Sequence, residues 1–355
     1  MAAPSEWQFR HRFLSQAVVF ATHRVVPTVQ AELDRVGSRR PMVICRGSAA
    51  PVGRRIFDAV GVGLWWDEVI QHVPAQLVDR ALAAAEAASV DAIVTIGGGS
   101  ATGLGKDLVR TLQVRHIAVP TTYSGSEGTN IWGITRDAVK VTGRDDGVLP
   151  DVVVYDADLV AGLPRQLAVT SCLNAMAHSV AALSSASDPI TDALAAESIR
   201  RLRHGLLPSP TSAAPLPEEN LLLGAYLSGV VLASAGTGLH HKICHLLGGT
   251  FGMPHALTHA AVLPHVVALQ GRDAKLAERL AAGFGTEAPS TVLERIVATL
   301  PERPNLASAG FRPEDVDRAT GLLVSSGPDR QDGGATQTDL HHIIEGARTG
   351  VQPTL

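Results

Sequence analysis

Residues 91–119 constrain the fold of this chain more than any other part of its sequence. They begin with DAIVTI (residues 91–96), an apolar run rich in β-branched residues, as found in strands buried on both faces. The glycine turn GGGS (residues 97–100) follows directly, then a segment with helical character to about Leu112 and a second strand over residues 116–119. Strand, glycine turn, helix and strand in this order predict a βαβ unit and therefore a parallel sheet.

The glycine turn also predicts a phosphate-binding site. Glycines let the backbone approach a pyrophosphate closely, and the helix that follows supplies amide donors and a positive potential at its N-terminus. A Walker A loop is excluded because Asp107 follows Lys106 where Ser or Thr is required. A plain tight turn is the alternative for glycines alone, but the hydroxyl-rich TTYSGSE after the next strand favours a dinucleotide. The expected cofactor contacts are Gly97, Gly98, Gly99, Ser100, Thr121, Thr122 and Ser126.

The two halves of the chain differ in their predicted structure. The first half alternates strands, such as PMVIC (residues 41–45), with helices, such as the alanine-rich residues 76–89. From residue 163 strand-like runs become rare, and helical segments are expected over residues 169–183, 191–204, 219–232, 274–284 and 290–300. We therefore expect an α/β dinucleotide-binding domain over residues 1–162, followed by an all-helical domain over residues 163–355.

Histidines gather in one short stretch of the second half. Residues 236–259 hold five of the 14 histidines, and His241 and His245 are spaced to project from one helix face. Gly248 and Gly249 are expected to end or bend that helix. Asn174 and His178 form a second pair at the same spacing. Two such pairs predict a single site between helices, whereas a buried core residue is the alternative for any histidine alone.

Charge and cysteine content exclude several function classes. Charged residues make up 18% of the chain, its net charge is −4 and no basic stripe stands out, so we expect no nucleic-acid partner. The three cysteines are widely spaced, which suits a reducing cytoplasm. Residues 221–239 are uncharged and long enough to span a membrane, but they include four glycines. We expect a buried helix there and no membrane association.

Several motifs, in this order, resemble the iron-containing alcohol dehydrogenase superfamily and within it the maleylacetate reductases. They are GGGSATGLGK, AVPTTYSGSE, IWGIT, KVTGRD, VLPDVVVYD, TSCLNAMAHSV, HHKICHLLGGTF and PHALTH. The resemblance implies a dehydroquinate synthase-like architecture, with an N-terminal dinucleotide-binding domain, an all-helical C-terminal domain and the active site in the cleft. It also implies NADH or NADPH as cofactor and a homodimer.

The resemblance also implies a set of metal-ligand positions. They fall on Asn174, His178, His241 and His255, with a proton-relay position at His245. The family's first ligand is an Asp, and the neutral amide of Asn174 is a poor ligand for a divalent ion beside three neutral imidazoles. Maleylacetate reductases share this Asn, and the resemblance implies that they work without metal. We therefore expect that no metal is required.

The implied reaction is hydride transfer from NADH or NADPH to maleylacetate, giving 3-oxoadipate. We expect His245 to donate the proton and His178, His241 and His255 to orient the substrate. Tyr123 and Asn174 are further expected substrate contacts, and Lys140 is an expected cofactor contact. The second strand ends in CRGS, with Arg46 and no carboxylate to repel a 2′-phosphate, so NADPH is expected to serve at least as well as NADH.

The sequence also departs from the family, which keeps alternatives open. Ala181 replaces an expected Glu, and Gly128 and Asn130 stand where bulkier residues are expected. One alternative is a reductase of another small carbonyl substrate in a specialised biosynthetic pathway. The others are a dehydroquinate synthase-like cyclase and a repurposed scaffold without catalysis.

Overall fold

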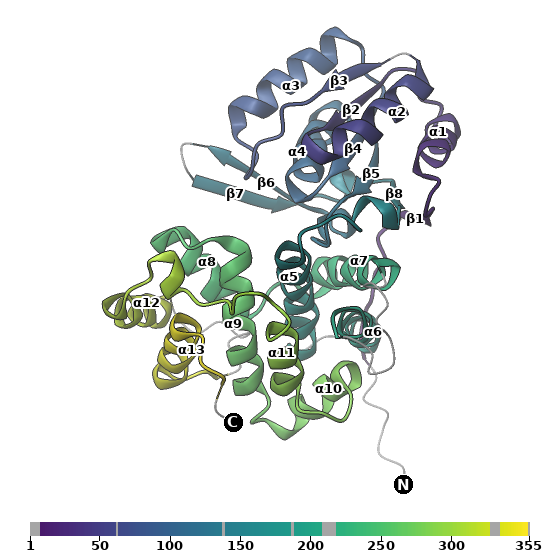
Figure 1. Ribbon diagram of the computed structural model, residues 1–355. Coiled ribbons are helices and arrows are strands. Elements are labelled where there is room, and N and C mark those ends of the chain that lie inside the picture. Colours follow the sequence, from purple (N-terminus) through teal and green to yellow (C-terminus); the bar gives the residue numbers. More distant parts are fainter. Residues whose placement is uncertain are drawn as a thin grey trace.

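A computed structural model of the chain describes residues 8–61, 63–136, 139–185, 188–207, 218–326 and 334–353. A parallel α/β half is followed by a helical half, which confirms the predicted fold class (Figure 1). The strands are β1 (Ala17–Phe20), β2 (Pro41–Cys45), β3 (Leu64–Trp66), β4 (Ala92–Gly97), β5 (Arg115–Pro120), β6 (Ile131–Arg136), β7 (Val139–Arg144) and β8 (Val152–Tyr155).

Helices α1 to α4 belong to the first half and α5 to α13 to the second. They are α1 (Val25–Arg35), α2 (Ala50–Val60), α3 (Ala75–Ala87), α4 (Gly99–Leu112), α5 (Arg165–Ser184), α6 (Pro189–Leu206), α7 (Glu218–Ala235), α8 (Leu239–Phe251), α9 (His255–Gln270), α10 (Ala274–Phe284), α11 (Pro289–Val297), α12 (Pro313–Ser325) and α13 (Gln337–Thr349). Short 3₁₀ turns are η1 (Gly47–Ala49), η2 (Ser126–Gly128), η3 (Asp146–Val148), η4 (Ala157–Leu159) and η5 (Ala307–Ala309).

The main sheet has six strands in the order β1-β8-β5-β4-β2-β3, and all its pairings are parallel. Side chains alternate between its two faces. Val43 and Cys45 of β2 pack with α1 and α2, whereas Met42 and Ile44 pack with α3 and α4. Because helices cover both faces of the sheet, the strands consist of continuous apolar runs, and this pattern allowed their prediction from the sequence.

Strands β6 and β7 form a separate antiparallel hairpin, which the sequence analysis did not predict. The hairpin lies beside α4 (Figure 1). The Arg110 guanidinium of α4 sits 4.1 Å from the ring centre of Trp132. On the opposite strand, a Cβ at Gly143 would come within 2.6 Å of the same indole ring. Glycine at this position therefore makes room for Trp132.

Helix α5 runs through the centre of the helical half and packs against α6, α7, α9 and α10. It is long and apolar enough to span a membrane by length and composition, but 78% of that window is buried inside the structure. The uncharged residues 221–239 are not one straight helix, since α7 ends at Ala235 and α8 begins at Leu239 at an angle of 96° to it. Both segments serve as core helices here.

Helix α8 ends later than predicted. It continues through Gly248 and Gly249 to Phe251, and Gly252 closes it in a left-handed conformation with φ of 67°. Glycine tolerates that conformation without steric cost, so Gly252 caps the helix, and Gly248 and Gly249 do not. Helix α9 then begins at His255 after Pro254, as predicted.

The two halves meet where η2 packs on α7. A Cβ at Gly229 would lie 2.1 Å from the carbonyl oxygen of Gly125, and one at Gly128 would lie 3.0 Å from that of Tyr226. This close backbone approach explains why Gly128 stands where a bulkier residue was expected. Asn130, the other departure in this segment, donates to Asp146 Oδ1 at 2.7 Å.

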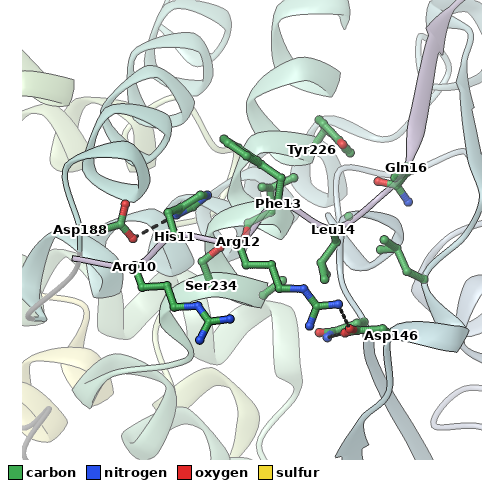
Figure 2. A pocket seen from close by; sticks show the side chains of 15 residues that line it. Arg10, His11, Arg12, Phe13, Leu14, Gln16, Asp146, Asp188, Tyr226 and Ser234 are labelled. Atoms are coloured by element: carbon green, nitrogen blue, oxygen red, sulfur yellow. Dashed lines mark hydrogen bonds and ion pairs between the residues drawn. The ribbon is translucent and has the colours of Figure 1, made fainter.

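The N-terminal arm, residues 10–16, also joins the two halves (Figure 2). His11 Nδ1 lies 3.1 Å from Asp188 at the start of α6, and Arg12 pairs with Asp146 of η3 at 2.6 Å. Beneath the arm is a cavity of about 340 Å³, with Tyr226 and Ser234 of α7 among its lining. None of the predicted site residues lines this cavity.

Candidate functional site

The glycine turn and the hydroxyl-rich segment lie together at the carboxyl edge of the sheet. Strand β4 ends at Gly97, and Gly98 caps the 14-residue α4. The Thr121 amide donates to the Gly97 carbonyl at 2.9 Å, and a Cβ on Gly98 would lie 3.0 Å from Cγ2 of Thr122. The N-terminus of α4 thus opens beside Thr121 and Thr122, an arrangement suited to a pyrophosphate. The cofactor roles of these residues stay predictions.

Lys106 ties α4 to the loop that follows β5. Its fully buried ammonium donates to the carbonyl oxygens of Ser126 and Thr129 at 2.7 Å and of Ile131 at 2.9 Å. The Thr129 hydroxyl lies 2.9 Å from the same nitrogen. Burial lowers the pKa of Lys106 to about 7, although the nearby Glu127 and Asp107 raise it. The sequence pattern presented this lysine only as a phosphate ligand of an excluded Walker A loop and did not show that it holds the loop after β5.

Asp107 is buried beside Lys106, and its two carboxyl oxygens have no hydrogen-bond partner in the described part of the chain. Burial raises the pKa of Asp107 from 3.8 to about 6, against the lowering effect of Arg110 and Lys106. Between these two values the folded chain holds a proton that the unfolded chain has lost, so stability falls as pH rises from about 4 to about 6.

Asp107→Asn removes this ionisation penalty. We expect the variant to gain about 3 kcal/mol above pH 6, seen as a melting temperature raised by roughly 3 to 4 °C at pH 7.5. The gain should disappear near pH 4, where the wild-type carboxyl is protonated in the folded state. Thermal melts of both proteins at the two pH values measure this difference, and an equal gain at both would refute it.

Four buried histidines from three helices form one cluster. The ring of His178 (α5) stacks on that of His241 (α8), with centroids 4.2 Å apart and planes 16° from parallel. His259 (α9) lies 5.1 Å from His241 and 4.9 Å from His240. The structure thus brings the two predicted pairs to one place, with Asn174 one turn before His178 on α5.

His245 and His255 lie at the exposed rim of this cluster. The ring centroid of His245 is 6.0 Å from that of His241, and His255 is 4.3 Å from His259. The cluster therefore has buried imidazoles below and two solvent-accessible ones above. A proton donor needs to exchange with solvent after each turnover, and the exposure of His245 meets that need.

The buried imidazoles are neutral at cellular pH. Burial, and secondarily the nearby His255 and His245, lower the pKa of His178 to about 3. Burial likewise lowers the pKa of His240 to about 3 and those of His241 and His259 well below their usual values. Buried atoms that lack a hydrogen-bond partner within the described ranges are Nδ1 of His178 and His240, both nitrogens of His241, Nε2 of His259 and Oδ1 of Asn174.

Two further predicted contacts are Tyr123 and Lys140. Tyr123 is only 1% exposed and packs in the helical core, and its contact with substrate stays a prediction. The backbone of Lys140 lies in β7, but its side chain falls outside the described part of the structure. Ala181, which replaces the expected Glu, is buried one turn beyond His178 and faces Gly238 at the start of α8.

No role was predicted for His240, Cys244 or His259 from the sequence. His240 and Cys244 are four residues apart on α8, and His259 follows His255 by four on α9. The same i, i+4 spacing that singled out His241 and His245 was therefore a usable signal. Applied to these residues, the same spacing predicts a second group of polar side chains on α8 and α9, next to the group that contains His241 and His245.

Both halves of the chain match families of known proteins. The family described as "Iron-containing alcohol dehydrogenase" matches residues 16–157, and "Fe-containing alcohol dehydrogenase family, C-terminal" matches residues 168–344. Maleylacetate reductase from Sphingobium indicum is 39% identical over 354 residues, covering 98% of this chain and 99% of that protein. Maleylacetate reductase 1 from Cupriavidus pinatubonensis is 37% identical over 353 residues, covering 96% and 98%.

Solved structures agree with these matches. The iron-containing alcohol dehydrogenase from Corynebacterium glutamicum superposes with a TM-score of 0.89 at 39% identity, covering 96% of this chain and 97% of that one. Maleylacetate reductase from Agrobacterium tumefaciens has a TM-score of 0.88 at 35% identity, covering 98% and 99%.

The matched family is iron-containing, and this finding contradicts the expectation that no metal is required. The site offers donor atoms whose chemistry suits a divalent ion. The unpartnered Oδ1 of Asn174 and nitrogens of His178 and His241 are buried, neutral donors of the kind that iron and zinc accept. The expectation rested on the neutral amide of Asn174 beside three neutral imidazoles and on the resemblance to reductases that work without metal, and the match to an iron-containing family overturns it.

Asn174→Asp restores the charge of the family's first ligand. We expect roughly tenfold or more tighter binding of Fe²⁺ or Zn²⁺, because a carboxylate adds a charge to a site of neutral donors. Metal content after dialysis at graded free-metal concentrations measures the affinity. Asn305→Asp, in the segment between α11 and η5, is the control, and an unchanged affinity in Asn174→Asp would contradict the expectation.

The matches cover both halves of the chain. The sequence matches, the fold and the histidine cluster agree. The chain is an oxidoreductase that belongs to the iron-containing alcohol dehydrogenase family.

Proposed function

We propose that the chain reduces maleylacetate to 3-oxoadipate with NADH or NADPH. The observation that carries this proposal is near full-length identity of 36–39% to proteins named maleylacetate reductase. The site supports it, because Asn174 stands at the first ligand position beside a cluster of neutral imidazoles. Such a cluster offers many hydrogen bonds to an oxygen-rich, doubly anionic substrate.

The reaction transfers two electrons as a hydride from the reduced nicotinamide to the alkene carbon distal to the ketone. The electron pair of the C=C bond moves onto the ketone oxygen, giving an enolate, and the nicotinamide is oxidised. A proton then adds to the carbon next to the ketone, which restores the carbonyl. We assign this proton to His245, whose exposed ring regains one from solvent.

The remaining proposed roles concern the binding of cofactor, substrate and metal. Gly97, Gly98, Gly99, Ser100, Thr121, Thr122, Ser126 and Lys140 are proposed to hold the cofactor. His178, His241 and His255, with Asn174, are proposed to orient the substrate and to hold the metal. When bound, a divalent ion supplies a Lewis acid that polarises a carbonyl oxygen.

The proposal is tested by following NAD(P)H oxidation with maleylacetate, simple aldehydes and related saturated keto acids. Rapid turnover of maleylacetate and slow turnover of aldehydes are expected. Turnover of aldehydes with none of maleylacetate would favour a reductase of another carbonyl substrate. No turnover combined with no nicotinamide binding would favour a scaffold without catalysis.

NADPH is expected to serve at least as well as NADH. Arg46 directly follows β2, and Cys45 pairs with Ile96 next to the glycine turn, so Arg46 lies at the cofactor edge of the sheet. One of its nitrogens donates to the Val69 carbonyl at 2.8 Å, which holds the side chain in place. Steady-state rates with both cofactors test this, and a preference of about a hundredfold for NADH, near 3 kcal/mol, would refute it.

We further propose a homodimer located in the cytoplasm, with a domain boundary between residues 162 and 163. Light scattering coupled to size-exclusion chromatography tests whether the chain is a homodimer. A monomer at micromolar concentration would contradict it.

A further inference from the structure

The corner between α7 and α8, residues 236–238, leads directly into the histidine cluster. The two helices meet there at an angle of 96°, and Gly236 has a φ of 78°, which favours glycine. A Cβ on Gly238 would lie 3.3 Å from that of Ala181, which follows His178 by three residues on α5. The direction in which α8 leaves this corner therefore decides where its histidines lie relative to α5.

Arg144 binds this corner from the other half of the chain. It is the last residue of β7, and its guanidinium donates to the carbonyl oxygen of Ala233 and, at 3.3 Å, to that of Leu232. The Leu232 carbonyl also accepts from the Gly236 amide at 3.0 Å, so Arg144 binds the carbonyls at the end of α7. The last carbonyls of a helix carry a partial negative charge and need partners from outside it, which suits a planar cation with several donors.

The backbone of Arg144 is connected to the loop that follows β5. Arg144 pairs with Ile131 at the base of the β6–β7 hairpin. The carbonyl of Ile131 accepts from the buried ammonium of Lys106, as does the carbonyl of Ser126, a proposed cofactor contact. Strand pairing and hydrogen bonds therefore run without a break from this loop, through Arg144, to the corner before α8.

The α/β half also touches α7 near the middle of the helix. There a Cβ at Gly229 would lie 2.1 Å from the carbonyl oxygen of Gly125, so the two backbones are in close contact. A contact at one point restrains the position of a helix but leaves it able to pivot. Arg144 adds a contact at the C-terminal end of α7, the end nearest to α8, and the two contacts together restrain the direction of the helix.

We propose that Arg144 is a positioning residue for hydride transfer, which holds the corner and, through it, His241 and His245 of α8 in place relative to the cofactor edge of the sheet. Hydride transfer requires reacting atoms about 3 to 3.5 Å apart, and a misplacement of about 1 Å can lower the rate by roughly 10²-fold. The alternative is a surface cap that contributes only stability. The inference rests on the proposed function, because the rate of maleylacetate reduction is one of its two readouts.

Arg144→Met removes the donors and keeps an unbranched side chain. We expect kcat for maleylacetate to fall by roughly tenfold or more, while the dissociation constant of NADH stays within about twofold of wild type because the glycine turn is unchanged. Hydrogen–deuterium exchange of peptides from residues 232–245, measured without substrate, should become faster because the corner opens more often. Arg144→Lys keeps the charge and should give values between those of Arg144→Met and wild type in both measurements.

Arg203→Met is the matched control. The Arg203 guanidinium also donates to a carbonyl at the end of a helix, that of Phe284, but it joins α6 to α10 within the helical half. We expect faster exchange near Phe284 and an unchanged kcat. A loss of stability alone would then not explain a lower rate in Arg144→Met.

Three results overturn the proposal: a kcat of Arg144→Met close to that of wild type, unchanged exchange over residues 232–245, or an equal loss of kcat in Arg203→Met. If Arg144→Met does not fold, Arg144→Lys decides, and wild-type values of both kcat and exchange in that variant overturn the proposal. A wild type that does not reduce maleylacetate would refute the proposed function instead. The exchange measurement, which needs no substrate, would then decide whether Arg144 holds the corner.

Discussion

His245→Ala is expected to lower the turnover of maleylacetate by about 10²-fold or more. The imidazole of His245 is exposed at the rim of the histidine cluster, where it can pass a proton to the substrate carbon and regain one from solvent. The alanine substitution removes the proton donor and leaves the glycine turn (residues 97–100) unchanged. The affinity for NADH should therefore stay nearly unchanged, and kcat should carry the loss.

His342→Ala is the matched control, because His342 is an exposed histidine on α13, away from the cluster. It should leave kcat and the affinity for NADH unchanged. Stopped-flow rates at saturating maleylacetate, with a fluorescence titration of NADH, separate the two effects. A turnover of His245→Ala within a few-fold of wild type would mean that another group delivers the proton.

Lys106→Met is expected to destabilise the chain and to weaken cofactor binding together. Methionine has nearly the same length but cannot donate to the four oxygens that Lys106 now holds between 2.7 and 2.9 Å. Leaving such buried acceptors unpaired costs about 4 kcal/mol or more, seen as a melting temperature lowered by roughly 5 °C or more. The loosened loop carries Ser126 and follows Thr122, so the dissociation constant of NADH should also rise.

Lys275→Met is the control for that substitution, since Lys275 is exposed on α10. It should change neither quantity. Differential scanning calorimetry and a nicotinamide fluorescence titration measure the two effects. A melting temperature of Lys106→Met equal to that of wild type would show that the hydrogen bonds of Lys106 do not hold the loop.

The fold was predictable where buried elements consist of continuous runs of apolar residues. Strands β2, β4 and β5 are covered on both faces, so their apolar runs predicted them to within about two residues. The β6–β7 hairpin was missed because its strands are partly exposed and contain Gly133 and Gly143, which weaken a strand pattern. The end of α8 was misplaced since a local sequence does not show which of several glycines adopts positive φ.

The part of the candidate site that follows from i, i+4 spacing on helices was predictable from the sequence. The i, i+4 pairs of Asn174 with His178 and of His241 with His245 indicated helix faces that converge, and the structure brings them together. Residue spacing does not show how deeply a side chain is buried. The burial of Tyr123 and the contact between His240 and His259 could therefore be seen only in the three-dimensional structure. The metal prediction was wrong because it inferred from a neutral donor set that no ion is held, whereas the chain matches an iron-containing family.

The most direct test of the proposed reaction follows the hydride itself. Maleylacetate is reduced with NADH carrying deuterium at the transferred position, and the product is examined by mass spectrometry and NMR. We expect 3-oxoadipate with one deuterium on the carbon beside the distal carboxylate, where exchange with solvent is slow, and a solvent-derived proton next to the ketone. Deuterium on a carbon that bears a hydroxyl group would mean that the enzyme reduces a carbonyl and would contradict the account.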